Sequence, residues 1–335
     1  MEYFIIEPGT FWDTILEILK EKAASGLDVK VIYDDIGCMA LLPGNYAKLL
    51  KKDGIDCVPF ARLRGQANNE FNNRSQRKIA VIDGKVAYTG GINLADEYIN
   101  KRVLYGHWKD TGIRLEGAAV HEMTMMFLSD YSLNVRVLPD FDKYSICVPA
   151  ETDGYLIPFG SGPVPVYKHY VGKAVIMNML NHAKDYVYIT TPYLIIDSEL
   201  TQTIENAAMR GVDVRIITPH IPDKKLVFGM TQSSYKRFID SGVRIYEYEP
   251  GFIHAKMYVS DDVYGMIGTI NLDYRSLVHH FENGVWLYKS SAVMDMKNDI
   301  LKTLDKCIEI SESDLKDTLT KRFIRALVKI FAPML

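Results

Sequence analysis

The fold is decided by a ten-residue stretch that occurs twice in the chain. Its second copy reads Phe252-Ile-His-Ala-Lys-Met-Tyr-Val-Ser-Asp261, and its first copy reads Arg74-Ser-Gln-Arg-Lys-Ile-Ala-Val-Ile-Asp83. Four residue pairs share one register of 178 residues: Gln76 with His254, Lys78 with Lys256, Asp83 with Asp261, and Asn93 with Asn271. Chance could supply one such pair, but hardly four in one register. The sequence therefore contains an internal repeat.

The blocks around both copies also recur in one order. Each half begins with a strand, a helix and two further β-branched strands, and the helices carry apolar residues at helical spacing. These blocks lie at 2–6, 11–25, 26–33 and 53–59, and again at 186–191, 198–210, 211–218 and 241–247. This alternation predicts an α/β fold with two pseudo-equivalent halves, each a mixed sheet flanked by helices, packed around one central cleft.

The repeat also predicts the domain boundaries. A first half at 1–140 is followed by a linker rich in Pro, Gly and Ser at 141–165, a second half at 166–312 and a C-terminal amphipathic helix at 313–335. A helix at 170–184 leads into the second half and has no counterpart ahead of the first. We therefore expect the first half to be truncated at its N-terminus.

Composition excludes several classes of protein. Of the 335 residues, 48% are apolar and 24% are charged, as in an ordinary soluble globular protein, and the net charge of −3 gives no general attraction to nucleic acid. The four cysteines have no metal-ligand spacing, so we expect free thiols and no metal site. No apolar run reaches the roughly 18–20 residues that a membrane span needs.

The repeated motif predicts a phosphate site. Residues i and i+2 of a strand face the same way, so His254 and Lys256 should project together into the cleft, where Asn271 follows the next strand. Imidazole, ammonium and amide groups together suit a phosphate. Glu282, on the strand after that, is the expected partner of a His254 ring nitrogen. A lone HxK pair is a weak signal, but two copies in one register are a strong one.

The pattern HxKx₄D followed by GTxN resembles the signatures of the phospholipase D superfamily. Within it the chain most resembles bacterial cardiolipin synthases, in the stretches Tyr33–Gly37, Lys78–Gly84, Thr89–Tyr98, His107–Thr111, Thr191–Tyr193 and Gly268–Ser276. The resemblance implies two phospholipase-D-like halves and a transferase that converts two phosphatidylglycerol molecules to cardiolipin and glycerol through a phosphohistidine. It implies no metal and no cofactor.

The resemblance also assigns roles to residues. It implies that Lys78, Asn93, Lys256 and Asn271 bind the phosphate, and that the catalytic set comprises Gln76, Lys78, Asp83, His254, Lys256, Asp261 and Glu282. Asp110 is a weaker candidate for the counterpart of Glu282 in the first half.

Gln76 stands where the family motif has histidine. A carboxamide offers no nucleophilic nitrogen and does not titrate near neutral pH, so we expect substrate binding to survive and turnover to be impaired. Three explanations stay open: decay of a gene copy, an engineered trap, or a paralogue that binds phospholipid without processing it. Two alternative functions remain, a phosphodiesterase or nuclease of the same superfamily and a catalytically silent phospholipid-binding protein.

The expected partners are phosphatidylglycerol and an anionic membrane surface, with no nucleic acid and an oligomeric state left open. The chain is expected at the bacterial cell membrane, peripheral or on its cytoplasmic side. Leu315–Leu335 places apolar residues every four positions opposite basic ones, which suits either a helix in the lipid interface or one docked on the protein. An acyl-chain pocket and ordinary core packing both remain open for the aromatic and apolar residues Tyr193, Phe228, Met230 and Tyr235.

Overall fold

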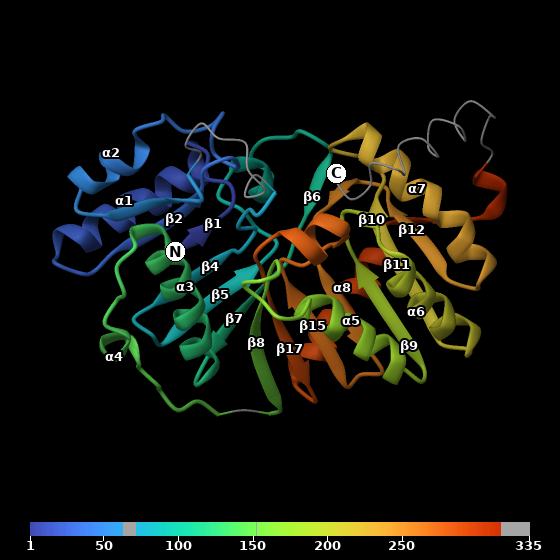
Figure 1. Cartoon of the computed structure of the whole chain (residues 1–335). Helices are drawn as coiled ribbons and strands as arrows, with labels where there is room; N and C mark the ends of the chain where they lie inside the picture. Colours follow the sequence, from blue (N-terminus) through green and yellow to red (C-terminus); the bar gives the residue numbers. More distant parts are fainter. Residues whose placement is uncertain (63–71, 152, 316–335) are drawn as a thin grey trace.

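Two mixed β-sheets, one from each half of the chain, lie side by side in the computed structural model (Figure 1). The structure describes residues 1–62, 72–151 and 153–315. The first sheet has the order β3-β2-β1-β4-β5-β7 and the second the order β18-β12-β11-β9-β14-β15-β17-β8. In both, three neighbouring parallel strands are followed by antiparallel ones. The predicted fold class is confirmed.

The first sheet comprises β1 (Glu2–Tyr3), β2 (Lys30–Asp34), β3 (Asp56–Phe60), β4 (Ile79–Ile82), β5 (Val86–Gly90) and β7 (Gly112–Glu116). The second comprises β8 (Tyr155–Ser161), β9 (Tyr186–Thr190), β11 (Asp213–Pro219), β12 (Arg244–Tyr248), β14 (Met257–Ser260), β15 (Tyr264–Gly268), β17 (Glu282–Tyr288) and β18 (Cys307–Ile310). The helices are α1 (Thr10–Ala24), α2 (Tyr46–Lys52), α3 (Ala119–Val135), α4 (Phe141–Tyr144), α5 (Val171–His182), α6 (Ser198–Met209), α7 (Lys225–Asp240) and α8 (Ser291–Leu304).

The helices α1 and α6 show how the repeat sets local structure. Each is followed by a glycine in the left-handed region, Gly26 at φ +86° and Gly211 at φ +93°. Glycine adopts this conformation without a steric penalty, so the chain leaves the helix and turns into the next strand. The two corresponding strands, β2 and β11, then enter their sheets in the same direction relative to β1 and β9.

One hydrophobic core joins the two halves. A single cluster of buried side chains includes Ile79 and Phe127 of the first half together with Tyr188 and Val285 of the second. Helix α3 contacts strands of both sheets, β3 and β4 on one side and β8 on the other. The halves therefore hold each other in a fixed position, which the site between them requires.

The predicted linker at 141–165 is wrong in part. Residues 155–161 form β8, which pairs antiparallel with β17 along its whole length and closes the edge of the second sheet. The glycines and Pro158 made this segment resemble a linker. An edge strand tolerates such residues because one side of it needs no ladder hydrogen bonds.

The predicted C-terminal helix at 313–335 lies outside the described residues beyond Leu315. Up to that point, Leu315 packs partly buried against the core of the second half. Among the helices that the structure describes, none combines the length and apolar character needed to cross a bilayer.

Two short pairings connect the halves next to the repeated motifs. Strand β6 (His107–Lys109) pairs in parallel with β13 (Gly251–Ile253), and Ser75 forms a parallel bridge with Phe281. In each case the segment before a motif in one half lies against a segment of the other half that is followed directly by an acidic residue. A second small sheet, of β10 (Leu194–Ile195) and β16 (Leu272–Asp273), lies within the second half.

Candidate active site

The two copies of the motif meet at one cavity of about 560 Å³. Its lining comes from both halves and includes Gln76, Asn93, His254, Asn271 and His280. The motif residues themselves lie in extended segments just before β4 and β14, and not inside those strands. The alternation of side chains nevertheless persists through these segments.

His254 is held by Asp110, across the boundary between the halves. The ring nitrogen Nδ1 lies 2.8 Å from Asp110 Oδ2, and the rings of Trp108, Tyr98 and Phe252 surround the imidazole with centroids 5.4, 5.5 and 5.9 Å away. The expectation that Glu282 would serve His254 is therefore wrong. The carboxylate comes from the first half.

The pairing of β6 with β13 explains this partnership. The backbone N–H of His254 donates to the carbonyl of Lys109 at 2.7 Å, so the next residue, Asp110, arrives beside the imidazole. Gly91 makes room for it, because a Cβ at that position would lie 2.0 Å from Asp110 Oδ1. The second glycine of the Thr89-Gly-Gly segment is thus a requirement of the carboxylate's position.

Electrostatics make His254 a neutral imidazole at neutral pH. Burial and the charge of Lys256 lower its pKa to about 4, although Asp110 acts in the opposite direction. Burial works against ionisation of Asp110, but His254, Lys256 and the Thr111 N–H together hold the pKa of its carboxyl below the ordinary value. With an ionised carboxylate as acceptor, Nδ1 carries the proton and Nε2 keeps its lone pair.

Both motif lysines are buried close to lining residues of the cavity, although neither is itself among the residues that line it. Lys78 and Lys256 are each 2% exposed, and each Nζ donates to the carbonyl oxygen two residues before it, of Gln76 at 2.8 Å and of His254. Burial lowers the pKa of Lys78 to about 8 and that of Lys256 to about 7. The charge of Lys78 also lowers the pKa of Lys256, so the two ammonium groups are close enough to interact.

Glu282 belongs to the Gln76 side of the site. The backbone N–H of Gln76 donates to the carbonyl of Phe281 at 2.8 Å, so Glu282 reaches the first-half motif and favours the charged form of Lys78. The carboxylate is fully buried and accepts from Ser276 Oγ at 2.6 Å and Thr269 Oγ1 at 2.5 Å. Each half thus contributes the acid that faces the motif of the other.

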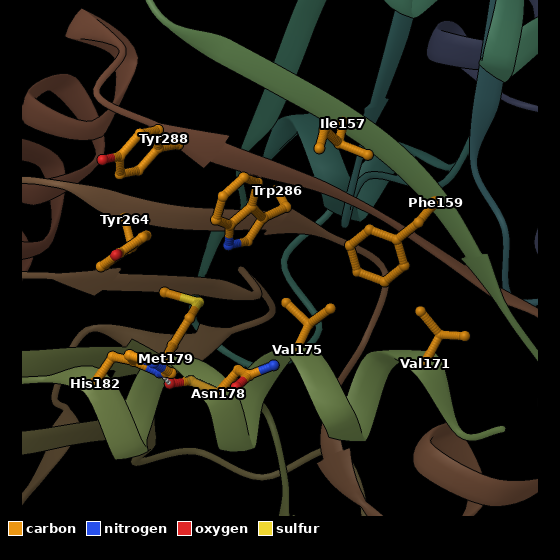
Figure 2. Close-up of a pocket in the computed structure, with 10 residues that line it drawn as sticks. All are labelled: Ile157, Phe159, Val171, Val175, Asn178, Met179, His182, Tyr264, Trp286 and Tyr288. Carbon is orange, nitrogen blue, oxygen red and sulfur yellow. Dashed lines mark hydrogen bonds between the residues drawn. The ribbon is translucent and has the colours of Figure 1, made fainter.

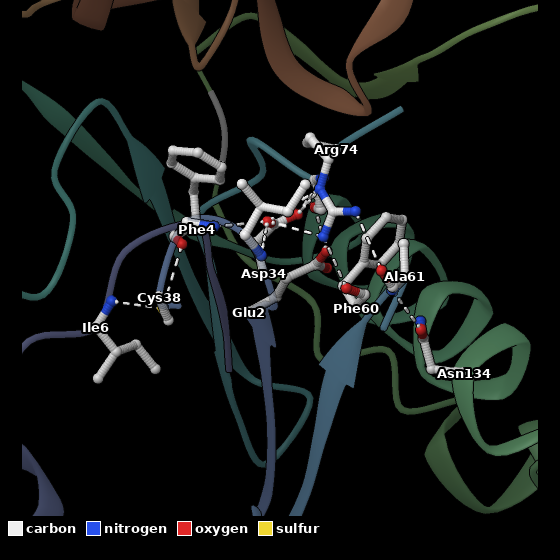
Figure 3. A network of polar contacts seen from close by, with 12 residues as sticks. Glu2, Phe4, Ile6, Asp34, Cys38, Phe60, Ala61, Arg74 and Asn134 are labelled. Atoms are coloured by element: carbon white, nitrogen blue, oxygen red, sulfur yellow. Dashed lines mark hydrogen bonds and ion pairs between the residues drawn. The ribbon is translucent and has the colours of Figure 1, made fainter. Parts of the chain in front are cut away.

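A buried ion pair holds the start of the first-half motif in place. Arg74 Nη2 lies 2.9 Å from Asp34 Oδ1, and the guanidinium also donates to the carbonyls of Phe60 and Ala61 (Figure 3). The same carboxylate accepts the backbone N–H of Ser75 at 3.1 Å. Breaking such a pair costs about 3–5 kcal/mol. Residues directly before Gln76 therefore cannot move easily.

This geometry agrees with comparisons to known proteins. Residues 176–304 match the family described as "Cardiolipin synthase, PLD-like domain". The chain is 33% identical to a cardiolipin synthase of Halalkalibacterium halodurans, over all of this chain and 67% of that protein. This chain belongs to the cardiolipin synthase-like family of the phospholipase D superfamily. An uncharacterized protein of Streptococcus mutans is 43% identical, over all of this chain and 73% of its own length.

A solved structure shows the same two-half fold. The phosphatidylserine synthase of Haemophilus influenzae matches with a TM-score of 0.73, covering 99% of this chain and 87% of that one at 16% sequence identity. At that identity the likeness concerns the fold alone.

The two asparagines that the family pattern assigns to phosphate differ in their surroundings. Asn93 accepts from the N–H of Ile5 at 3.2 Å and donates to Tyr98 Oη at 2.6 Å, so one amide hydrogen remains for a ligand. The side-chain oxygen of Asn271 is buried and has no hydrogen-bond partner among the described residues. The side-chain amide of Asn271 therefore has more free hydrogen-bonding capacity for a ligand than that of Asn93.

The aspartates of the motifs lie away from the cavity. Asp261 has φ +55° at the turn after β14, and its carboxylate accepts the N–H groups of Lys184, Asp185 and Tyr186. Asp83 lies exposed at the matching turn after β4. Five extended residues span roughly 16 Å, which separates each aspartate from its lysine. Neither Asp83 nor Asp261 is among the residues that line the cavity, and their place in the catalytic set stays a prediction.

The residues considered for an acyl-chain pocket do not all lie at one place in the structure. Tyr193 lines the catalytic cavity, whereas Met230 and Tyr235 are buried in the protein. A more apolar pocket of about 510 Å³ lies elsewhere, where rings on β15 and β17 face α5 (Figure 2). Its lining includes Tyr264, Trp286 and Met179.

Sequence reasoning missed His280. It lines the same cavity as Gln76 and His254 and is 8% exposed. The available signal was its spacing, two residues before Glu282, which places both side chains on one side of an extended segment.

Proposed function

We propose that this chain exchanges phosphodiesters, transferring a phosphatidyl group from one phosphatidylglycerol to another and releasing glycerol. The observation that supports it is a neutral His254, oriented by Asp110, at a cavity flanked by two buried lysines. A neutral imidazole can attack phosphorus, and buried ammonium groups stabilise the charge that develops on the phosphate oxygens.

The proposed reaction has two steps at phosphorus. Nε2 of His254 bonds to phosphorus while the bond to the glycerol oxygen breaks, and that oxygen takes up a proton to leave as glycerol. A hydroxyl of a second phosphatidylglycerol then bonds to phosphorus, gives up its proton and displaces the imidazole. One phosphodiester is exchanged for another, so Asp110 need only stabilise the histidine through both steps.

Apolar residues around the cavity support a lipid substrate. Leu104 and Val227 line the cavity, and Leu104 and the adjoining residues Val103 and Leu226 are 47%, 73% and 53% exposed. Exposed large apolar groups next to a phosphate site suit a substrate with acyl chains, taken from a membrane surface. We accordingly propose phosphatidylglycerol and an anionic bilayer as partners, and a peripheral position at the bacterial membrane.

Gln76 slows this reaction in the proposal. Its amide can donate to a phosphate oxygen but cannot carry a proton between oxygen atoms. Substrate binding is therefore retained, while the proton must move through another group.

The experiment measures glycerol release and cardiolipin formation from vesicles of phosphatidylglycerol, by mass spectrometry. Wild-type protein is compared with Gln76→His, which should be faster because it restores an imidazole to the first motif. Formation of phosphatidic acid without cardiolipin would show that water is the acceptor. Lipid binding without product in both proteins would support the silent lipid-binding alternative and end the proposal.

A further inference from the structure

His280 is a buried histidine that lines the same cavity as Gln76 and His254. Neither Nδ1 nor Nε2 has a hydrogen-bond partner among the residues that the structure describes, although the side chain is only 9% exposed. Each nitrogen of an imidazole is either a hydrogen-bond donor or a hydrogen-bond acceptor. A buried nitrogen that is left without a partner costs about 1–3 kcal/mol. Such a cost suggests that the missing partner is a ligand.

The backbone directs this ring to the side of the site that lacks a histidine. Phe281 exchanges hydrogen bonds with the first-half motif, donating to Arg74 O at 2.9 Å and accepting from Gln76 N at 2.8 Å. Side chains alternate along an extended segment, so Phe281 points into the core beside Phe60 while His280 and Glu282 share the other side. His280 consequently lies at the cavity together with Gln76.

A carboxylate already faces the ring. His280 Nδ1 is 3.6 Å from Glu282 Oε1, which is too long for a hydrogen bond but close enough for an imidazolium to have a counter-charge. His254 also faces a carboxylate, that of Asp110, but at the hydrogen-bond distance of 2.8 Å. The site therefore contains two histidine–carboxylate pairs, although only one histidine belongs to a repeated motif.

We propose that His280 carries the proton that a histidine at position 76 would carry, an inference that rests on the function proposed above. In the first step, the His254 Nε2–phosphorus bond forms, the bond from phosphorus to the glycerol oxygen breaks, and that oxygen takes the proton of the His280 imidazolium. In the second step, neutral His280 takes the proton of the incoming hydroxyl as the oxygen–phosphorus bond forms and the nitrogen–phosphorus bond breaks. With Nδ1 facing Glu282, Nε2 is the nitrogen that exchanges the proton.

The main test is rescue from a different position. His280→Asn should lower glycerol release by a factor of about 10²–10⁴, the usual contribution of a general acid–base group. The double variant Gln76→His plus His280→Asn should recover most of that loss. A histidine with a packing role alone would give the same loss without rescue. His182→Asn, an exposed histidine on α5 that does not line this cavity, is the control for the substitution and should keep the wild-type rate.

A second readout separates proton transfer from folding. Phenyl and p-nitrophenyl phosphodiesters differ in how much their leaving oxygen needs a proton. His280→Asn should slow release of phenol much more than release of p-nitrophenol, and phosphorylated His254 should accumulate with the second ester. Equal slowing of both esters would overturn the proposal.

The outcomes also distinguish this proposal from the proposed function. A wild-type chain without turnover, beside an active Gln76→His variant, overturns the role of His280 and leaves the lipid reaction intact. Cleavage of the aryl esters without any release of glycerol from phosphatidylglycerol counts against the lipid substrate. In that case the comparison of the two esters still tests whether His280 transfers the proton. No cleavage of any of these substrates by either protein overturns both.

Discussion

The two copies of the motif share the same framework and differ in the side chain at the first motif position, Gln76 in one and His254 in the other. On the second-half side, His254 lies 2.8 Å from Asp110. On the first-half side, Gln76 occupies the matching position, and Glu282 is held by Ser276 and Thr269. Lys78 and Lys256 nevertheless keep equivalent hydrogen bonds and equal burial. In the proposed reaction, phosphate binding and proton transfer are therefore carried by different side chains.

The difference also shows why each acid serves the opposite motif. The short pairings β6–β13 and Ser75–Phe281 join the two halves, and each of them brings the acid of one half directly beside the motif of the other. Correct docking of the halves is then a condition for orienting His254. A catalytic centre of this kind forms only when the whole fold forms.

The largest expected effect comes from placing glutamine at the histidine position of both motifs. His254→Gln leaves no imidazole in either motif, so glycerol release should fall by a factor of about 10⁴–10⁶, as when a covalent nucleophile is lost. Binding of glycerophosphoglycerol, measured by calorimetry, should persist because both lysines remain. A variant that retains near wild-type turnover would exclude His254 as the nucleophile.

The next effect compares the two acids. Asp110→Asn should lower turnover by a factor of about 10²–10⁴ because the Nδ1 proton of His254 loses its ionised acceptor. Glu282→Gln should have the smaller effect, since this carboxylate does not touch His254. Measured rates of glycerol release at one pH decide the order. The reverse order would support the original sequence-based pairing of Glu282 with His254.

Much of the fold could be predicted from the sequence because the repeat is a local signal. The turns at Gly26 and Gly211, and the strands before and after the motifs, follow from residue pattern alone. Strand β8 did not, since its glycines and Pro158 are also typical of linkers. Only its pairing with β17 makes it a strand.

The site was predictable as a set of residues but not as a set of contacts. A repeat gives the register inside each half and carries no information on the pairing between halves, so the His254–Asp110 contact could not be derived. Asp110 follows Asn93 by 17 residues, while Glu282 follows Asn271 by 11, which also obscured their correspondence. The distance of the motif aspartates from the cavity was not predictable either, because a sequence pattern does not show that five extended residues lead away from a pocket.

A smaller effect concerns the shared lysines and pH. In the proposed function their ammonium forms bind the phosphodiester, and burial has lowered the pKa of Lys256 to about 7 and that of Lys78 to about 8. Raising the pH through this range removes protons from the free site, so affinity for glycerophosphoglycerol should fall, by up to about tenfold per pH unit for each proton.

This ligand suits the measurement because a phosphodiester keeps its single charge between pH 6 and 9. Lys256→Met should remove the part of the decrease that begins near pH 7, while the part due to Lys78 remains. Calorimetric titrations at several pH values give both curves. A constant affinity between pH 6 and 9 would mean that the lysines stay charged or do not contact the phosphate.

The smallest effect tests the two motif aspartates against each other. Both have a left-handed backbone, φ +54° at Asp83 and +55° at Asp261, which asparagine also tolerates. Asp261 accepts three N–H groups from the segment between α5 and β9, whereas Asp83 is exposed. Asp261→Asn should therefore lower the free energy of unfolding by about 1–2 kcal/mol in urea, and Asp83→Asn by less than about 0.5 kcal/mol. Equal losses would mean that the turn itself, and not the captured N–H groups, accounts for the second motif's aspartate.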